Sequence, residues 1–344
     1  MPVFKIIVNN KVVNIQTMSM RFIPLTICFL LIACSSQKKL DTDAQIIRFD
    51  TALYQYLTQN EPDGFLDEYR TFLDEYGEKI IGIGRSDSAG FYSRLREYFS
   101  ESTLMQLYSD QQVLFSDISA LNAELSSGME ILLKQFPELR RSKIYLHVSG
   151  WLQNVVVSDE ILSLSADKYM GADYSLYPEF FYEYQRQNML PERVAPDYLL
   201  GFLMANFPFR GNAEVLLDRM IYEGKLRYIL SRLLPKRKMW EYVGYTGEQH
   251  KWCNTHRDRI WKSILDNQHL YRPDYFTTDI YLKDAPTTAT LSPDSPGRVG
   301  VWIGFQIVVS YMERHPTTDW RTLMNQTDYV AFLKESRFNP KKVR

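Results

Sequence analysis

Cys34 is the residue for which the surrounding sequence most clearly indicates a chemical modification. It ends the run Leu31-Ile32-Ala33-Cys34, in which a branched apolar residue, a tolerated residue, a small residue and a cysteine follow one another. This is the lipobox pattern: the thiol can form a thioether to diacylglycerol, and the small Ala33 suits the peptidase that cuts beside it. The pattern therefore predicts cleavage before Cys34 and a lipid anchor on its sulfur.

The segment before Cys34 has the layout of an export signal. Arg21 precedes an apolar run over 22–32, which has about the length of a signal-peptide core and is too short to span a bilayer. Residues 1–17 fit this layout poorly, and Met18 or Met20 is the better start. We therefore divide the chain into a mis-assigned extension (1–17), a signal peptide (18–33), a tether (34–43) and a globular domain (44–344).

The histidines and the remaining cysteine lack the spacing of a metal site. No two of the five histidines are four residues apart, so no HExxH motif places two imidazoles on one helical face. His250, Cys253 and His256 form a cluster of ligand-type residues, but on a helix they spread over about 120° and a fourth ligand is missing. We expect no metal and no other cofactor, and a structural Cys253 because no flanking motif would activate its thiol.

Glu223 is the carboxylate that we single out. It falls on the apolar ridge of a predicted helix, together with Leu216, Met220, Leu230 and Leu234. An acid in that place is partly buried and needs a partner, which Arg219 or Arg227 can supply from four residues away. A structural ion pair is the favoured interpretation, and a functional role stays open.

Gly300 and Gly304 interrupt a helix pattern in the segment 297–304. Each glycine costs about 1 kcal/mol relative to alanine inside a helix. Because they fall on one face, they let another backbone approach closely. We favour tight internal packing over a ligand site.

The elements that must position these residues follow the order helix, sheet, helix. The pattern predicts helices over 44–138, strands at 143–148, 154–157 and 161–164, and helices again from Pro196. The later helices are one capped by Asn212 that ends at Leu234, one over 247–266, one over 298–314, and a short pair after Asp319. We expect one large α+β domain, mainly helical with a small central sheet.

Composition excludes some functions. Removal of the first 33 residues takes away three basic residues and no acid, which leaves a net charge of −4 and no electrostatic footprint for nucleic acid. Of the three cysteines, Cys28 lies in the signal and Cys34 is the lipidation site. Cys253 therefore has no partner for an intramolecular disulfide.

Four segments, with the lipobox, resemble the gliding-motility lipoprotein GldB family. They are 165–173, 220–225, 244–249 and 295–308. The resemblance implies a zincin-like scaffold in which Glu223-Gly224 corresponds to the element that supplies a third zinc ligand. The stretch 198–209, where two histidines belong, contains none, so Glu223 is a candidate relic of a lost zinc site. Asp173, Arg298 and Trp302, in the same segments, are candidate structural or partner-surface residues.

The resemblance implies a non-catalytic lipoprotein of a cell-envelope machine for gliding motility and type IX secretion. We expect it at the outer membrane, held through Cys34, with protein partners. A tether without an acidic cluster favours the periplasmic face. Two alternatives stay open: a zincin-like hydrolase that uses Glu223, and a glycan-binding lipoprotein, which the 14% aromatic content suggests.

Overall fold

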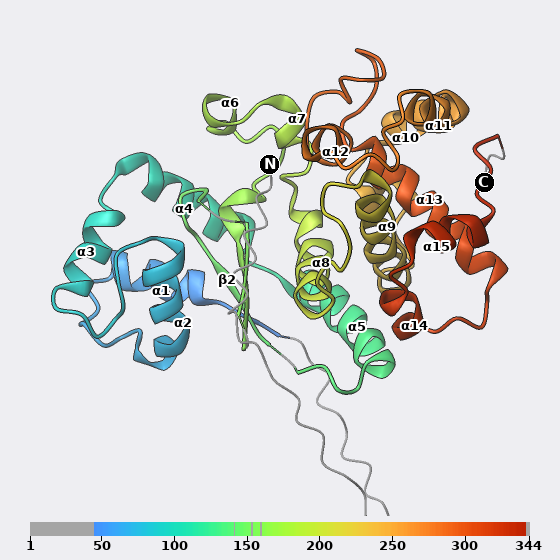
Figure 1. Ribbon diagram of the computed structural model, residues 1–344. Helices are drawn as coiled ribbons and strands as arrows, with labels where there is room; N and C mark the ends of the chain where they lie inside the picture. Colours follow the sequence, from blue (N-terminus) through green and yellow to red (C-terminus); the bar gives the residue numbers. More distant parts are fainter. Residues whose placement is uncertain (1–44, 141, 153, 159, 342–344) are drawn as a thin grey trace, which may run out of the picture.

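The computed structural model describes residues 45–140, 142–152, 154–158 and 160–341. In this part the chain is mainly helical with one small sheet, as Figure 1 shows, so the predicted α+β class is confirmed. The predicted signal peptide, Cys34 and the tether lie outside the described residues.

The sheet has the strand order β1-β2-β4-β3, with β1 Ile46–Ile47, β2 Lys143–His147, β3 Val155–Val157 and β4 Ile161–Ser165. β2 runs parallel to β1 and β4, whereas β3 and β4 form an antiparallel hairpin. The three predicted strands are confirmed. β1 lies in a stretch that we predicted to be helical, and that prediction is wrong at Ile46. Ile46 is held in the sheet by pairing with Ile144 and by a 3.0 Å hydrogen bond from its N–H to Asn122 Oδ1. The prediction failed because such long-range pairing overrides a local helical pattern.

The α-helices are the commonest elements among the described residues. They are α1 Phe49–Thr58, α2 Arg70–Glu75, α3 Phe91–Tyr98, α4 Ser102–Leu114, α5 Ser119–Gln135, α6 Tyr177–Phe180, α7 Glu183–Arg186, α8 Val194–Asn206, α9 Leu216–Leu233, α10 Gly247–Thr255, α11 Arg257–Asp266, α12 Tyr275–Leu282, α13 Val299–Arg314, α14 Trp320–Asn325 and α15 Tyr329–Ser336. Among the helices that the structure describes, none has both the length and the apolar character needed to cross a bilayer.

The sheet separates two hydrophobic cores. Because successive strand residues point to opposite faces, Tyr145 packs with α1 and α2 on one side, while Ile144 and Leu146 pack with α5 and α8 on the other. Figure 1 shows α1, α2 and α3 on one side of β2 and the larger group that includes α5, α8 and α9 on the other. The larger core extends from the sheet through α9 to α13.

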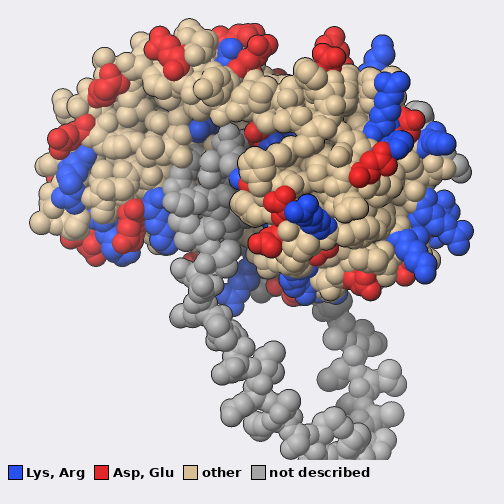
Figure 2. All heavy atoms as spheres, turned by 45° about the horizontal axis from the view of Figure 1, so that its top comes forward, with Lys and Arg blue, Asp and Glu red and all other residues tan. Residues whose placement is uncertain are grey.

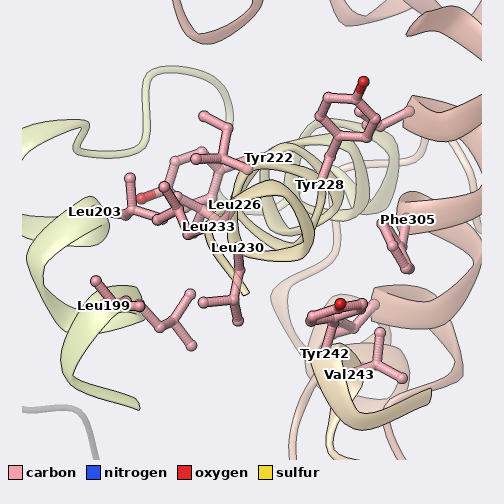
Figure 3. Packing of buried hydrophobic residues seen from close by; sticks show 14 of the residues in the cluster. Leu199, Leu203, Tyr222, Leu226, Tyr228, Leu230, Leu233, Tyr242, Val243 and Phe305 are labelled. Carbon is pink, nitrogen blue, oxygen red and sulfur yellow. The ribbon is translucent and has the colours of Figure 1, made fainter. Parts of the chain in front are cut away.

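Helix α9 is buried along nearly its whole length and crosses α13 at two glycines. A Cβ added at Gly304 would overlap the carbonyl oxygen of Met220, and one at Gly224 would lie 2.8 Å from the Phe305 nitrogen. The backbones therefore approach more closely than any side chain allows, and the packing role predicted for Gly304 is confirmed. Figure 3 shows the two sides of α9, with Leu199 of α8 on one and Phe305 of α13 on the other.

Two predicted helix boundaries are wrong. Asn212 does not cap α9: its side chain accepts a hydrogen bond from the Glu214 N–H at 3.0 Å within a turn, and α9 begins only after the extended Val215. A side-chain turn of this kind competes with capping. The predicted helix over 247–266 is two helices, α10 and α11, because the backbone at His256 leaves helical geometry.

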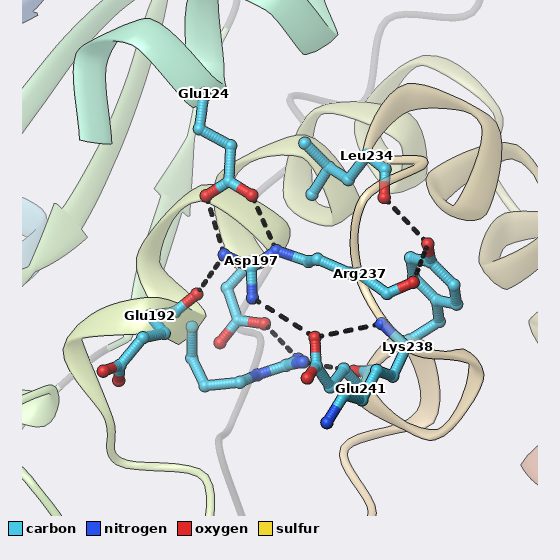
Figure 4. A network of polar contacts seen from close by, with 9 residues as sticks. Glu124, Glu192, Asp197, Leu234, Arg237, Lys238 and Glu241 are labelled. Atoms are coloured by element: carbon cyan, nitrogen blue, oxygen red, sulfur yellow. Dashed lines mark hydrogen bonds and ion pairs between the residues drawn. The ribbon is translucent and has the colours of Figure 1, made fainter. Parts of the chain in front are cut away.

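A polar network joins the turn after α9 to α5 and to the segment before α8 (Figure 4). The Arg237 guanidinium donates two hydrogen bonds of 2.7 Å to the Glu124 carboxylate and a third of 2.7 Å to the Glu192 carbonyl. Such bidentate pairing fixes orientation as well as distance. It ties the turn after α9 to α5 and to the segment before α8.

Candidate functional site

Glu223 lies near the middle of α9 with only 11% of its side chain exposed. An arginine stands one turn away on each side. Arg227 Nη1 is 3.1 Å from one carboxylate oxygen, and Arg219 Nη2 is 3.9 Å from the other. These are the two partners that the four-residue spacing predicted. Arg227 is itself buried, whereas Arg219 is about one-third exposed and lies over the Phe209 ring, 4.9 Å from its centre.

Glu223 lines a cavity of about 260 Å³ between α9 and α12, which we call the α9–α12 cavity. Both helices supply charged and polar side chains to it, and the chain after α12 adds others. The lining residues are Met204, Ala213, Arg219, Glu223, Arg227, Tyr275, Thr278, Asp279, Leu282, Lys283, Asp284 and Arg298. Sequence reasoning missed the contribution of 275–284, because no motif marks that segment and only the fold brings it beside α9.

Arg298 adds a third guanidinium to this cavity. It precedes α13 with φ +59°, a left-handed conformation that is uncommon for residues other than glycine. Its Nε lies 3.4 Å from Asp284 Oδ1, and both side chains are less than one-fifth exposed. The structure therefore brings together Glu223 and Arg298, two residues singled out separately in the sequence, around one cavity.

Burial and like charge act together on Arg227. Burial lowers the pKa of its guanidinium to about 10; the Glu223 carboxylate counteracts that shift, and the nearby Arg298 adds to it. Arg227 still carries its charge at neutral pH. Glu223 is thus the counter-ion of a buried positive charge, a role that engages its oxygens and competes with metal ligation or base catalysis.

Helix α8 is where the resemblance would place the two zinc-binding histidines. It carries apolar residues toward α9, including Leu199 and Leu203. Its acid, Asp197, is held by Arg193 Nη2 and by the Tyr169 hydroxyl, each at 2.8 Å. Within residues 45–341, apart from the three undescribed positions, no group of three histidine, cysteine or acidic side chains is placed to hold a metal. These residues do not fit a zinc ion, and the zincin-like relationship stays a prediction.

Asp173 does not line the α9–α12 cavity. It lies on an open groove of about 890 Å³ whose other lining residues include Tyr182, Tyr184 and Thr246. The rings of Tyr182 and Tyr184 are nearly parallel with centres 5.9 Å apart, and Tyr182 is largely exposed. A partly exposed aromatic pair of this kind is compatible with a partner surface at Asp173.

Trp302 is fully buried, which leaves it a structural role rather than one on a partner surface. Its indole N–H donates to His250 Nδ1 at 3.2 Å, and Arg257 lies over its ring at 5.2 Å. The neighbouring Cys253 is also fully buried, and burial raises the pKa of its thiol to about 12. A thiol of that pKa is protonated at neutral pH, so the expected structural assignment of Cys253 gains support.

A second polar cluster lies where β2 and β4 end, and sequence reasoning did not identify it. His147 Nδ1 is 2.5 Å from Ser163 Oγ, and the fully buried Asp167 accepts hydrogen bonds from the N–H groups of Ser149 and Trp151. Burial raises the pKa of Asp167 and lowers that of His147 to about 3. The signal was present in the alternation Ile161-Leu162-Ser163-Leu164-Ser165, which places both serines on one face of β4.

Comparison with known proteins gives one match. The profile of the family described as gliding motility protein GldB matches residues 34–340. No curated protein and no solved structure matches the chain.

Proposed function

Because the chain belongs to the family of gliding motility protein GldB, we propose that this lipoprotein is a non-enzymatic, lipid-anchored component of the gliding machinery. It is held through Cys34 in the outer membrane, faces the periplasm, and works through protein partners, in association with type IX secretion. The observation that carries the proposal is the family match, which begins at the cysteine that ends the lipobox.

The proposed domain layout keeps the globular part close to the membrane. Residues 18–33 are the signal peptide and 34–43 the tether, with residues 1–17 outside the functional protein. An extended chain rises at most about 3.3–3.6 Å per residue, so ten tether residues reach about 35 Å. The domain from residue 44 on would therefore meet only partners near the membrane surface.

The surroundings of Glu223 support the non-enzymatic part of the proposal. Its carboxylate is shared between Arg219 and Arg227 at 3.9 and 3.1 Å. A base or metal ligand needs a free lone pair directed at its target, whereas a carboxylate held by two cations serves chiefly to neutralise them. Glu223 then contributes to the fold and to the charge of the α9–α12 cavity.

Replacing the anchor residue tests the proposal. Cys34→Ala should remove labelled palmitate from the protein and release it from membranes, because lipid anchoring adds about 0.8 kcal/mol per buried CH₂. In a gliding host that lacks its own family member, this variant should fail to restore gliding. Cys28→Ala is the matched control, because Cys28 lies in the signal peptide and should leave labelling unchanged. A Cys34→Ala protein that stays in the membrane and restores gliding would refute the proposal.

A further inference from the structure

We infer that the α9–α12 cavity binds an oxyanion group, a phosphate or a carboxylate, between the guanidinium groups of Arg227 and Arg298. This inference goes beyond the proposed function and does not depend on it. It rests on the charge balance around the cavity, on the incompletely compensated charge of Arg227, which lines it, and on its size.

The charges that line the cavity do not balance. Lys283 pairs with Asp279 one turn before it, and Arg298 lies 3.4 Å from Asp284. Glu223 is the third acid of the lining, and it is shared between two arginines, Arg219 and Arg227. The lining therefore holds four basic side chains and three acidic ones, an excess of one positive charge.

Arg227 is the most deeply buried of the ion-paired cations that line the cavity. Its side chain is only 4% exposed, and its Nη1 makes no hydrogen bond with any part of the chain that the structure describes. The 3.1 Å contact with Glu223 is thus an ion pair without hydrogen-bond alignment. A buried donor left without a hydrogen bond costs about 1–3 kcal/mol and more when charged, so Glu223 compensates the charge of Arg227 only in part.

The second guanidinium makes an anion the fitting partner. Arg298 lines the same cavity and disfavours the charge on Arg227, since both are cations in a buried setting. An oxyanion placed between them would attract both and offset part of the uncompensated positive charge. Guanidinium groups bind carboxylate and phosphate through two parallel hydrogen bonds, which a single ammonium cannot do.

The dimensions limit the ligand to a small group. The cavity of about 260 Å³ is close to the lower end of small-molecule sites, which span about 300–1,000 Å³. Tyr275, Leu282 and Met204 form part of its wall, and such partly apolar walls strengthen the attraction between charges. A phosphate or carboxylate group fits these conditions, whether it is free or the end of a larger molecule.

Calorimetric titration of the full chain in neutral detergent tests the inference. Inorganic phosphate and acetate are titrated separately at constant ionic strength, with chloride as the reference anion. We expect saturable binding of at least one oxyanion, with one site per chain, and no comparable binding of chloride. The stronger of the two identifies the chemistry of the natural group. Absence of saturable binding for both oxyanions would overturn the inference.

Variants locate the site and separate binding from folding. Arg227→Gln should abolish binding, and Arg227→Lys, which keeps the charge beside Glu223, should weaken it about tenfold or more in a folded protein. Glu223→Gln should tighten binding several-fold, because it removes the anion that competes for Arg227. Lys262→Gln on the exposed face of α11 is the matched control and should bind as wild type does. Unchanged affinity in folded Arg227→Lys and Glu223→Gln chains would overturn the assignment.

Discussion

At the scale of one residue, a substitution of Glu223 distinguishes a structural role of its carboxylate from a catalytic one. Glu223→Gln keeps the shape and removes the charge, which leaves the buried Arg227 without its counter-ion. Breaking a buried pair from one side costs about 3–5 kcal/mol and an exposed pair about 0–1 kcal/mol. We expect a loss of about 1–3 kcal/mol in the free energy of unfolding, measured by urea denaturation.

The same variant separates the two functional interpretations. If Glu223 is structural, gliding restored by Glu223→Gln should fall only in proportion to the amount of folded protein. A hydrolase that depends on Glu223 would give a fully stable protein without function. That combination in a melting curve and a complementation assay would contradict the non-enzymatic proposal.

His147 predicts a pH dependence of stability. Burial lowers the pKa of its imidazole from 6.5 to about 3, so the folded protein holds it neutral while the unfolded chain takes up a proton below pH 6.5. The unfolded state then binds more protons, and stability falls as pH drops from 6.5 towards 3. Between pH 6.5 and 4.5 this loss amounts to about 2–3 kcal/mol.

His147→Gln isolates that contribution, because an amide can still hydrogen-bond Ser163 but does not titrate in this range. The difference in unfolding free energy between wild type and variant should change by about 2–3 kcal/mol across the same window. Parallel curves for the two proteins from pH 6.5 to 4.5 would show that His147 makes no such contribution.

At the scale of elements, the crossing of α9 and α13 depends on Gly304. In Gly304→Ala the new Cβ would overlap the Met220 carbonyl oxygen, and the nearest atoms all belong to the Met220 backbone, which cannot turn aside. Overpacking of this kind costs about 1–3 kcal/mol, which outweighs the gain in helix propensity of about 0.5–1 kcal/mol. We expect a net loss of stability in urea denaturation.

Gly247→Ala supplies the comparison for that prediction. Gly247 is also helical, at the start of α10, but a Cβ there would meet nothing closer than the Trp240 ring at 3.7 Å. This substitution should be neutral or stabilising by up to about 1 kcal/mol. If Gly304→Ala proved as harmless as Gly247→Ala, the close approach of the two backbones would not be needed.

The sequence predicts those elements whose hydrophobic pattern is complete within their own segment. The apolar strands β2, β3 and β4 and the glycine face of α13 were predictable, because period-two and period-3.6 patterns lie within each segment. The ion pairs of Glu223 followed from spacing along one helix. By contrast, the strand at Ile46 depends on Ile144, almost a hundred residues away, and nothing local reports that pairing.

The same distinction explains what was missed in the site. The lining of the α9–α12 cavity combines α9, α12 and Arg298, which are distant in sequence and share no motif. Sequence spacing could relate Glu223 to Arg227 but not to Asp284. The buried charge of Arg227, on which the anion inference rests, emerges only from tertiary packing.

At the scale of the whole molecule, the face shown in Figure 2 carries no large area of a single charge sign. On the face shown in Figure 2, acidic and basic side chains are interspersed among a larger area of uncharged residues. This agrees with the nearly neutral composition. Electrostatic steering of a highly charged partner is therefore not a feature of this face.

The two hydrophobic cores share the same strands, and this sharing predicts how the whole protein unfolds. Tyr145 of β2 stacks on Phe72 of the smaller core with ring centres 4.2 Å apart, while its carbonyl accepts a hydrogen bond from Tyr198 of the larger core. The Tyr76 hydroxyl of the smaller core donates to the Val148 carbonyl at 2.5 Å. If the helices of one core unfolded, the strands that support the other core would lose their packing as well. We therefore expect one cooperative unfolding transition despite the size of the chain.

The positions of the tryptophans allow a direct test of that expectation. All six lie at or after Trp151, so tryptophan fluorescence does not sample α1–α4 directly, whereas far-ultraviolet circular dichroism reports every helix. In urea, the two transitions should coincide in midpoint and slope, as two-state unfolding requires. Tyr76→Phe, which removes one link between the smaller core and the chain after β2, should lower both midpoints together. A dichroism change that precedes the fluorescence change would instead show that α1–α4 unfold on their own.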